Sequence, residues 1–224
     1  MKRKRPWWFG WIPAIVLALL SLATGVTALL LVQGGLGAPA PRPTEGQVTD
    51  LNWSVFTPDG LDYVDSTREV RIDLSSPPVA ASALGLEPDD SLTIGPKFTG
   101  DTVLDYYLIV NGAGESPGGD KFTVSELTVD TENGEVTAVR APLSEVLGFR
   151  PTLQKLLGTA DVYGWDTSGV DAIYDLVGAA TEAGEGYEFG FGPADRLGFA
   201  ITGTASCDAG GYCVVEYVMT PAVR

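Results

Sequence analysis

Two cysteines and 29 acidic residues are the side chains of this 224-residue sequence that could carry chemistry, since it contains no histidine. The missing imidazole excludes Ser-His-Asp and Cys-His catalytic relays and any histidine-ligated metal. Two thiolates are also too few for a four-thiolate zinc or iron–sulfur site. The sequence therefore predicts no catalytic residue, no cofactor and no metal site, and it leaves open what a cysteine pair and carboxylates can do.

The two cysteines lie close together in the sequence. Cys207 and Cys213 bracket five residues between two apolar runs, and the Gly210-Gly211 pair can bend the chain so that the sulfurs meet across the end of a hairpin. A redox-active pair is the alternative. The spacing is not Cys-x-x-Cys, however, and no basic residue lies close by in the sequence to lower a thiol pKa. We predict a structural disulfide, which an oxidising compartment would preserve.

The carboxylates do not single out an acid–base pair. A glycosidase needs two carboxylates at a set separation, and 29 acids on one domain are typical of a solvated surface. The acidic cluster Asp130, Glu132 and Glu135 lacks the spacing of an EF-hand, although acidic loops of extracellular modules can hold Ca²⁺ weakly. Asn133-Gly134 lies inside this cluster and is typical of a type I′ hairpin turn, so we predict a turn there.

The net charge of −15 is distributed unevenly along the chain. A basic block at residues 2–5 precedes an apolar run at 7–32 that has no charged residue, and every acidic residue lies at or after Glu45. A membrane-spanning helix needs about 20 apolar residues, so this run is long enough. Trp7, Trp8 and Trp11 lie at its basic end, where interfacial aromatic side chains are favoured. We predict an uncleaved single-pass anchor with a cytoplasmic N-terminus.

A cleaved secretory signal peptide is the alternative to this anchor. Ala38-Pro39-Ala40 imitates a small-x-small cleavage site, but Pro41 would follow the cut, and the apolar run is longer than the ~7–15 residues of a signal peptide. Both alternatives place the rest of the chain outside the cytoplasm. The predicted organisation is a cytoplasmic tail at 1–6, a transmembrane anchor at 7–32, a Gly/Pro/Ala tether at 33–47 and an extracytoplasmic domain at 48–224.

The outer domain has the patterns of an α+β fold with a mainly antiparallel β-sheet and two or three short helices. Alternating or continuous apolar residues predict strands, which we expect at 51–56, 69–74, 104–110, 122–129, 134–141, 187–191, 197–204 and 212–219. The run at 104–110 is the most apolar and suits a buried central strand. The runs at 122–129 and 134–141 are expected to form one hairpin.

Helical signals are fewer. Pro151 favours a short helix at 151–157 that ends at Gly158. Ser168 and Asp171 resemble a capping box that opens a second helix, with Val170, Ile173, Tyr174 and Val177 as its apolar stripe. A stripe of this kind could dock a partner, but it more often faces the core. We expect a loop or one helical turn at 75–90 and a mobile loop at 112–120.

Three aromatic residues could serve a binding surface. They are Trp53, Trp165 and Tyr212, although aromatic side chains of this kind more often contribute at least partly to a core.

One stretch resembles a known family. The segment YYLIVNGAGESPGGDKFTVSELTVDTENGEVTAVRAPLSEVL is similar to the opening of a LytR-CpsA-Psr domain, and GVDAIYDLVG and PADRLGFAITG suit later parts of that domain. The resemblance covers residues 106–203. Members of the family have a short cytoplasmic N-terminus, one membrane anchor and an outer α/β domain. The order of elements in the family is a strand, a glycine-containing loop, Arg-x-Asp-Thr, two strands joined by a turn, and then Pro-Arg-Asp.

The catalytic positions of that family do not carry over to this sequence. Lys121-Phe122-Thr123 stands where Arg-Ser-Asp-Thr would be expected, and Ala141-Pro142-Leu143-Ser144 stands where Pro-Arg-Asp would be expected. In the family those arginines bind a lipid pyrophosphate, and neither lysine nor leucine supplies a bidentate guanidinium. The resemblance therefore implies a degenerate, non-catalytic relative.

These observations predict a non-enzymatic, membrane-anchored accessory or assembly subunit of a bacterial envelope membrane complex, facing outward from the plasma membrane. Its expected partners are the membrane and an integral membrane protein complex or an envelope component. Nucleic acid is excluded as a partner because residues 42–224 carry ten basic against 29 acidic residues, a net charge of −19. One alternative is a LytR-CpsA-Psr-like transferase of lipid-linked glycan. Copurification of a polyprenyl pyrophosphate sugar that is lost on changing Lys121 or Arg140 would favour it. The other is a carbohydrate- or ion-binding surface module.

Overall fold

The computed structural model describes residues 16, 21, 42–44, 46–113 and 120–222. The chain divides into two units, Met1–Arg42 and Pro43–Arg224, and the elements described below belong to the second. Apart from Val16 and Ser21, the predicted anchor lies outside the described residues, as does most of the tether. Within the described part of the chain, no helix is both long enough and apolar enough to cross a membrane.

The second unit has the predicted α+β class, with a mostly antiparallel sheet and three α-helices in its described part. In chain order the elements are α2 (Pro58–Thr67), β1 (Glu69–Asp73), the 3₁₀ helix η2 (Ala81–Leu84), β2 (Ser91–Ile94), β3 (Lys97–Thr99), β4 (Thr102–Leu104), β5 (Tyr106–Asn111), β6 (Asp120–Val124), β7 (Leu127–Glu132), β8 (Glu135–Gly148), α3 (Phe149–Tyr163), α4 (Val170–Ala183), β9 (Tyr187–Ala194), β10 (Phe199–Cys207) and β11 (Tyr212–Pro221).

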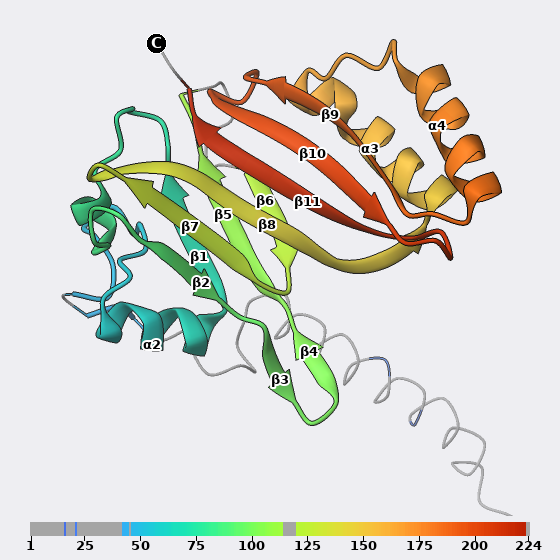
Figure 1. Ribbon diagram of the computed structural model, residues 1–224. Helices are drawn as coiled ribbons and strands as arrows, with labels where there is room; N and C mark the ends of the chain where they lie inside the picture. The colour runs from blue at the N-terminus through green and yellow to red at the C-terminus, as the bar shows by residue number, and fades with distance from the viewer. Residues whose placement is uncertain (1–15, 17–20, 22–41, 45, 114–119, 223–224) are drawn as a thin grey trace, which may run out of the picture. The chain divides into compact units, whose positions relative to one another are not determined.

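The long strand β8 joins two parts of the main sheet: the strands β1, β2, β5, β6 and β7 on one side of it, and β9, β10 and β11 on the other. The strand order is β1-β5-β6-β8-β11-β10-β9, with β7 paired to the first part of β8 and β2 paired to β7. Only β1 and β5 run parallel among these pairs. On its other edge β8 pairs with β11. Figure 1 shows α3 and α4 on one face of the part of the sheet formed by β9, β10 and β11, while α2 lies beside β1.

The core follows from the two-residue alternation of the strands. In β10, Phe199, Ile201 and Ala205 are buried, whereas Thr202 and Thr204 between them are half-buried. Because successive side chains of a strand point to opposite faces, the buried set lies on one face of the sheet. The same alternation holds in β11. The C-terminal strands predicted at 187–191, 197–204 and 212–219 are therefore confirmed, with β9, β10 and β11 each somewhat longer than predicted.

The predicted strand at 51–56 is wrong. Only Ser54 of this stretch forms a β-bridge, an isolated one with Val48. Asn52 interrupts an extended conformation because its φ is 65°, and the chain then enters α2, a helix that the alternation pattern did not indicate. The hydroxyl of Thr57 caps that helix by accepting a hydrogen bond from the Gly60 N–H, and Pro58 takes its first position.

The predicted hairpin is confirmed at its turn but not along its first strand. Asn133 and Gly134 have φ values of 52° and 81°, as a type I′ turn requires, and they join β7 to β8. The run at 122–129, however, is divided between β6, which ends at Val124, and β7, which begins at Leu127. Strand β6 pairs with β5 instead of continuing the hairpin. Because the run is divided, one apolar stretch supplies two strands, of which β6 pairs with β5 and β7 pairs with the first part of β8.

The run expected to form a buried central strand is β5. It lies next to the edge strand β1, and only one of its faces is buried, since Tyr107 is 41% exposed. The stretch at 75–90 contains the single 3₁₀ turn η2, as predicted. Of the predicted mobile loop at 112–120, residues 114–119 lie outside the described residues.

Helix α3 is twice as long as predicted. It continues through Gly158, which is exposed and has open space around its Cα, and it ends at Gly164, whose N–H bonds the carbonyl of Ala160. Glycine lowers helix propensity by only about 1 kcal/mol, so packing of the apolar face of α3 against the sheet outweighs that cost. The predicted end at Gly158 is therefore wrong.

Helix α4 forms without the predicted capping box. Its N-cap is Gly169 and it has no side-chain cap, because the Ser168 hydroxyl and N–H bond the carboxylate of Asp166 instead. Its stripe faces the core as expected: Ile173 is buried and Val170 and Val177 pack against the core, whereas the fourth member, Tyr174, is 51% exposed.

Candidate binding cleft

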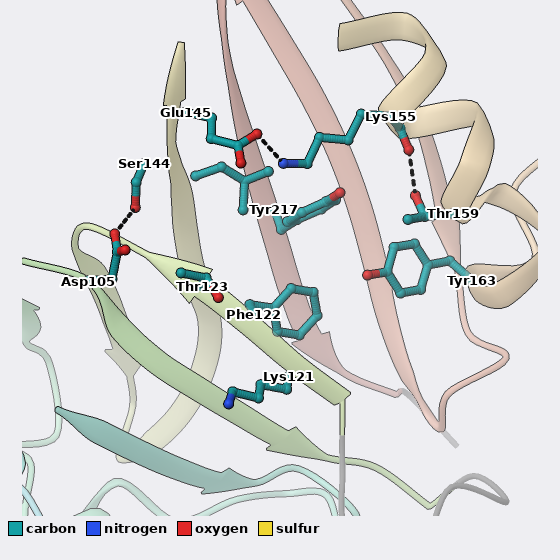
Figure 2. A pocket seen from close by; sticks show the side chains of 11 residues that line it. Asp105, Lys121, Phe122, Thr123, Ser144, Glu145, Lys155, Thr159, Tyr163 and Tyr217 are labelled. Carbon is teal, nitrogen blue, oxygen red and sulfur yellow. Dashed lines mark hydrogen bonds and ion pairs between the residues drawn. The ribbon is translucent and has the colours of Figure 1, made fainter. Parts of the chain in front are cut away.

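A cleft of about 320 Å³ lies where β6, β8, β11 and α3 meet (Figure 2). Its lining comprises Asp105, Lys121, Phe122, Thr123, Leu143, Ser144, Glu145, Lys155, Thr159, Tyr163 and Tyr217. These residues come from distant parts of the sequence, and one of them, Asp105, lies between β4 and β5.

The cleft exists because two strand pairings are incomplete. Strand β6 touches β8 at a single pair, Val124 and Leu143, so the edge of β6 before Val124 is not hydrogen-bonded to β8. On the other side of β8, the register with β11 shifts between Val214 and Glu216. An irregularity of this kind bends a strand and re-aims its side chains. The space between β6 and β11 is consequently filled by side chains and not by a ladder of backbone hydrogen bonds.

Three aromatic rings form the floor of the cleft. The ring centroid of Phe122 lies 5.4 Å from that of Tyr217 and 6.4 Å from that of Tyr163, and the two tyrosine rings are 5.9 Å apart. All three side chains are buried. Figure 2 shows the hydroxyl group of Tyr163 directed from α3 toward the space between the other two rings. The floor is therefore apolar with phenol groups within it.

Burial also decides the protonation of these phenols. It raises the pKa of Tyr163 well above its ordinary value, assisted by the nearby Tyr217 and Asp120, and it raises the pKa of Tyr217 as well. Both phenols consequently keep their protons throughout the physiological pH range. Tyr217 is already hydrogen-bonded to Thr159, so Tyr163 is the phenol that can donate to a ligand, and neither is suited to act as a phenolate nucleophile.

The rim of the cleft carries two lysines and two carboxylates in a balanced arrangement. Lys155 Nζ lies 2.7 Å from Glu145 Oε2, and the Ser144 hydroxyl donates to Asp105 Oδ1 over 2.7 Å. The ammonium group of Lys121 lies over the ring of Tyr107, 4.0 Å from its centroid, in a cation–π contact. The formal charge of this rim is zero in a protein whose net charge is −15.

The predicted disulfide is confirmed. Cys207 and Cys213 are directly opposite each other in the β10–β11 pair, their Cα atoms are 3.9 Å apart, and the structure contains the bond between them. The backbone turns between them at Asp208 to Gly211, where the Gly211 N–H bonds the Asp208 carbonyl. This bond lies at the end of a hairpin and does not line the cleft.

The structure does not bring the two basic residues of the transferase alternative together. Lys121 lines the cleft, but Arg140 does not, and its Nε lies 2.7 Å from Asp130 Oδ2 on the neighbouring strand β7. The acidic cluster around the β7–β8 turn thus uses one of its carboxylates in an ion pair. Among the residues that the structure describes, no three possible metal ligands gather at one place.

The three aromatic residues proposed for a surface lie outside the cleft as well. Trp165 is buried and donates a hydrogen bond from Nε1 to the Ile201 carbonyl over 2.9 Å, directly behind the cleft floor. Tyr212 is 65% exposed near the disulfide, and Trp53 is half-buried.

Sequence reasoning missed most of the cleft. One signal was present: Lys155, Thr159 and Tyr163 recur at intervals of four residues, which places them on one face of a helix. The predicted helix ended at Gly158, so it contained Lys155 but not Thr159 and Tyr163, and their common face was not recognised. No local pattern related them to Tyr217 or Asp105.

Comparison of the chain with protein-family models, with curated proteins and with solved structures finds no match in any of the three. The function is therefore argued from the cleft and from the arrangement of charge along the sequence.

Proposed function

We propose that this protein is a non-enzymatic, membrane-anchored accessory or assembly subunit of a bacterial envelope complex, and that its extracytoplasmic domain acts by binding. The observation that carries the proposal is the internally satisfied rim of the cleft. A binding site can hold its polar groups in place through such contacts, because preorganised side chains lose less entropy when a ligand arrives.

The same contacts argue against catalysis in the cleft. A general base needs a carboxylate free to accept a proton from the substrate, but Glu145 is engaged by Lys155. The Ser144 hydroxyl group would be the candidate nucleophile, since it donates a hydrogen bond to the carboxylate of Asp105. Histidine and lysine are the common bases of activated serines, and this sequence has no histidine. The nearby lysine, Lys155, is bound to Glu145.

The anchored location rests on the distribution of charge and hydropathy. The basic block at residues 2–5, the uncharged run at 7–32 and the acidic remainder follow the order expected of a protein with a cytoplasmic N-terminus. A tether of about fifteen residues would keep the outer domain within a few tens of ångströms of the membrane, at roughly 3.1 Å per extended residue. This distance favours a partner that is itself membrane-embedded.

The test is to tag the C-terminus of the full-length protein, crosslink it in intact cells, solubilise it in mild detergent and identify what copurifies. We expect one integral membrane protein in a fixed ratio to the tagged chain. Recovery of a monomer alone after crosslinking would contradict the accessory role. Copurification of a polyprenyl pyrophosphate sugar that is lost in Lys121→Ala would contradict the non-enzymatic role and favour the transferase.

A further inference from the structure

We infer that the cleft binds one uncharged sugar ring, a pyranose unit of an envelope glycan. The inference rests on the proposed binding role and adds the chemical class of the ligand to it. Three features of the cleft carry it: the aromatic floor, the paired rim and the size.

The floor matches the apolar face of a sugar ring. A pyranose presents C–H groups on its faces and hydroxyl groups around its edge. Phe122, Tyr163 and Tyr217 supply three rings within 6.4 Å of one another. They pack against each other and are at most 8% exposed, so a ligand meets a small apolar part of them and not an open π face. A purely aliphatic ligand such as an acyl chain fits less well, because it would offer no hydrogen bond to the hydroxyl group of Tyr163 in the floor.

The rim matches the hydroxyl groups of a sugar. Each sugar hydroxyl both donates and accepts, and the rim offers the corresponding mixture: carboxylate acceptors at Asp105 and Glu145, and an ammonium donor at Lys155. The hydroxyl groups of Thr123, Ser144 and Thr159 can do either. One ring can therefore reach several partners around its edge without displacing an existing ion pair.

The charge balance favours a neutral ligand. A phosphate or carboxylate ligand would meet Glu145 beside Lys155, 2.7 Å from its ammonium group, and would approach a protein of net charge −15. A cationic ligand would meet Lys121 and Lys155 at the same rim. An uncharged ring avoids both costs.

The volume of the cleft is the third feature. About 320 Å³ lies at the lower end of the range for small-molecule sites, which suits one ring better than an extended oligosaccharide. Neighbouring sugars of a glycan would then extend into solvent.

The experiment uses the full-length protein in a detergent whose headgroup is not a sugar. Glucose, N-acetylglucosamine and chitotriose are titrated while the thermal unfolding midpoint and the tryptophan fluorescence are recorded, with inorganic pyrophosphate as the anionic comparison. We expect at least one sugar to raise the midpoint saturably, by roughly 3 °C at ten times its Kd. Trp165 should report binding, since its ring centroid lies 4.8 Å from that of Tyr163.

Two variants locate the site. Tyr163→Phe removes one hydroxyl group from the floor while keeping the ring, and should weaken sugar binding about tenfold, the effect expected of a lost ligand hydrogen bond. Tyr212→Phe makes the same chemical change at a tyrosine that is 65% exposed outside the cleft, and should leave affinity unchanged. If Tyr163→Phe proves unstable, Ser144→Ala at the rim serves in its place.

Three results would overturn the inference: no midpoint shift with any of the sugars, stabilisation by pyrophosphate alone, or equal affinities for Tyr163→Phe and Tyr212→Phe. The outcome is separate from that of crosslinking in cells. A membrane partner found without sugar binding rejects the ligand only, whereas sugar binding by a chain that crosslinks to nothing rejects the accessory role only.

Discussion

At the scale of single residues, Trp165 is closely packed behind the floor of the cleft. The indole stacks on Phe191 and Tyr217, at centroid distances of 6.0 and 6.1 Å, and its Nε1 donates to the Ile201 carbonyl. Gly203 of β10 lies against this ring, and a Cβ at that position would be 2.6 Å from Cη2 of the indole. The glycine is therefore required by close approach and not by an unusual backbone conformation.

Gly203→Ala is expected to lower the free energy of unfolding by about 1–3 kcal/mol, because the indole that it would displace is buried on all sides. Gly158→Ala is the matched control: Gly158 is an exposed position inside α3 with open space around it, and the same change should raise the free energy of unfolding by about 0.5–1 kcal/mol. Urea denaturation measures both. Similar changes in the two variants would refute the packing of the indole against Gly203.

Asp65 makes folding stability depend on pH. Its Oδ2 accepts a hydrogen bond from Lys97 over 2.7 Å and its Oδ1 accepts one from Tyr106 over 3.1 Å, which joins α2 to β3 and β5. The hydrogen bond from Lys97 is the largest cause that lowers the pKa of Asp65 below its ordinary 3.8, and burial opposes it. The same site raises the pKa of Tyr106 to about 12, chiefly through burial.

A carboxyl group with a lowered pKa stabilises the folded state above its ordinary pKa, and this contribution is lost as the pH falls through the lowered value. Asp65→Asn should therefore reduce the free energy of unfolding at pH 7, by less than about 1 kcal/mol for so exposed a pair, and the difference from the wild type should shrink as the pH falls below 3.8 and through the lowered pKa. Asp62→Asn, at an exposed carboxylate on the same helix, is the control. A difference independent of pH would show that the ion pair is not its cause.

At the scale of elements, the β10–β11 hairpin has the longest uninterrupted strand pairing among the described strands of the sheet. The two strands pair over nine consecutive positions without a register shift, from Phe199 with Pro221 to Cys207 with Cys213. The disulfide closes the hairpin at its turn. This hairpin supplies Tyr217 to the cleft floor, so its register sets the position of that ring.

Reducing or replacing the disulfide should lower stability without changing the register. A loop of this length predicts a loss of about 2 kcal/mol in the free energy of unfolding. Cys207→Ser with Cys213→Ser, compared with the wild type in urea with and without dithiothreitol, measures it. The double variant should be insensitive to dithiothreitol. A wild type equally insensitive to dithiothreitol, at concentrations shown to reduce the bond, would contradict a stabilising role.

At the scale of the whole molecule, charge separates the chain into a basic N-terminus and a strongly acidic remainder. The predicted orientation places residues 48–224 outside the cytoplasm. An oxidising extracytoplasmic compartment would also preserve the disulfide. The native cysteines are poor reporters of orientation because both are buried. A new cysteine on the exposed face of α4 avoids this difficulty.

Ala179→Cys, built into a chain that lacks the two native cysteines, should react with a membrane-impermeant thiol reagent in intact cells. Ala179 is exposed near the end of α4, so the reagent can reach it in the folded domain. A cysteine introduced at Lys2 is the internal comparison and should react only after the cells are opened. The reverse pattern of labelling would overturn the orientation.

The fold class and several elements could be read from local patterns. Alternating apolar residues predicted the C-terminal strands, Asn133-Gly134 predicted the turn between β7 and β8, and the spacing of Cys207 and Cys213 predicted their bond. Each of these features depends on neighbours within about ten residues. The errors arose where a local signal met a stronger tertiary one, as at Gly158, where packing carries α3 past a poor helix former.

The sequence alone thus determined the strands that alternate, the disulfide and the charge asymmetry, because burial on one face of a strand leaves a two-residue period in the chain. Tertiary structure alone decided the cleft. Asp105, Lys155 and Tyr217 meet because β6 stops pairing with β8 after one position and β8 shifts its register on β11. Where two strands cease to pair depends on contacts between distant segments, and no periodicity within either strand records it.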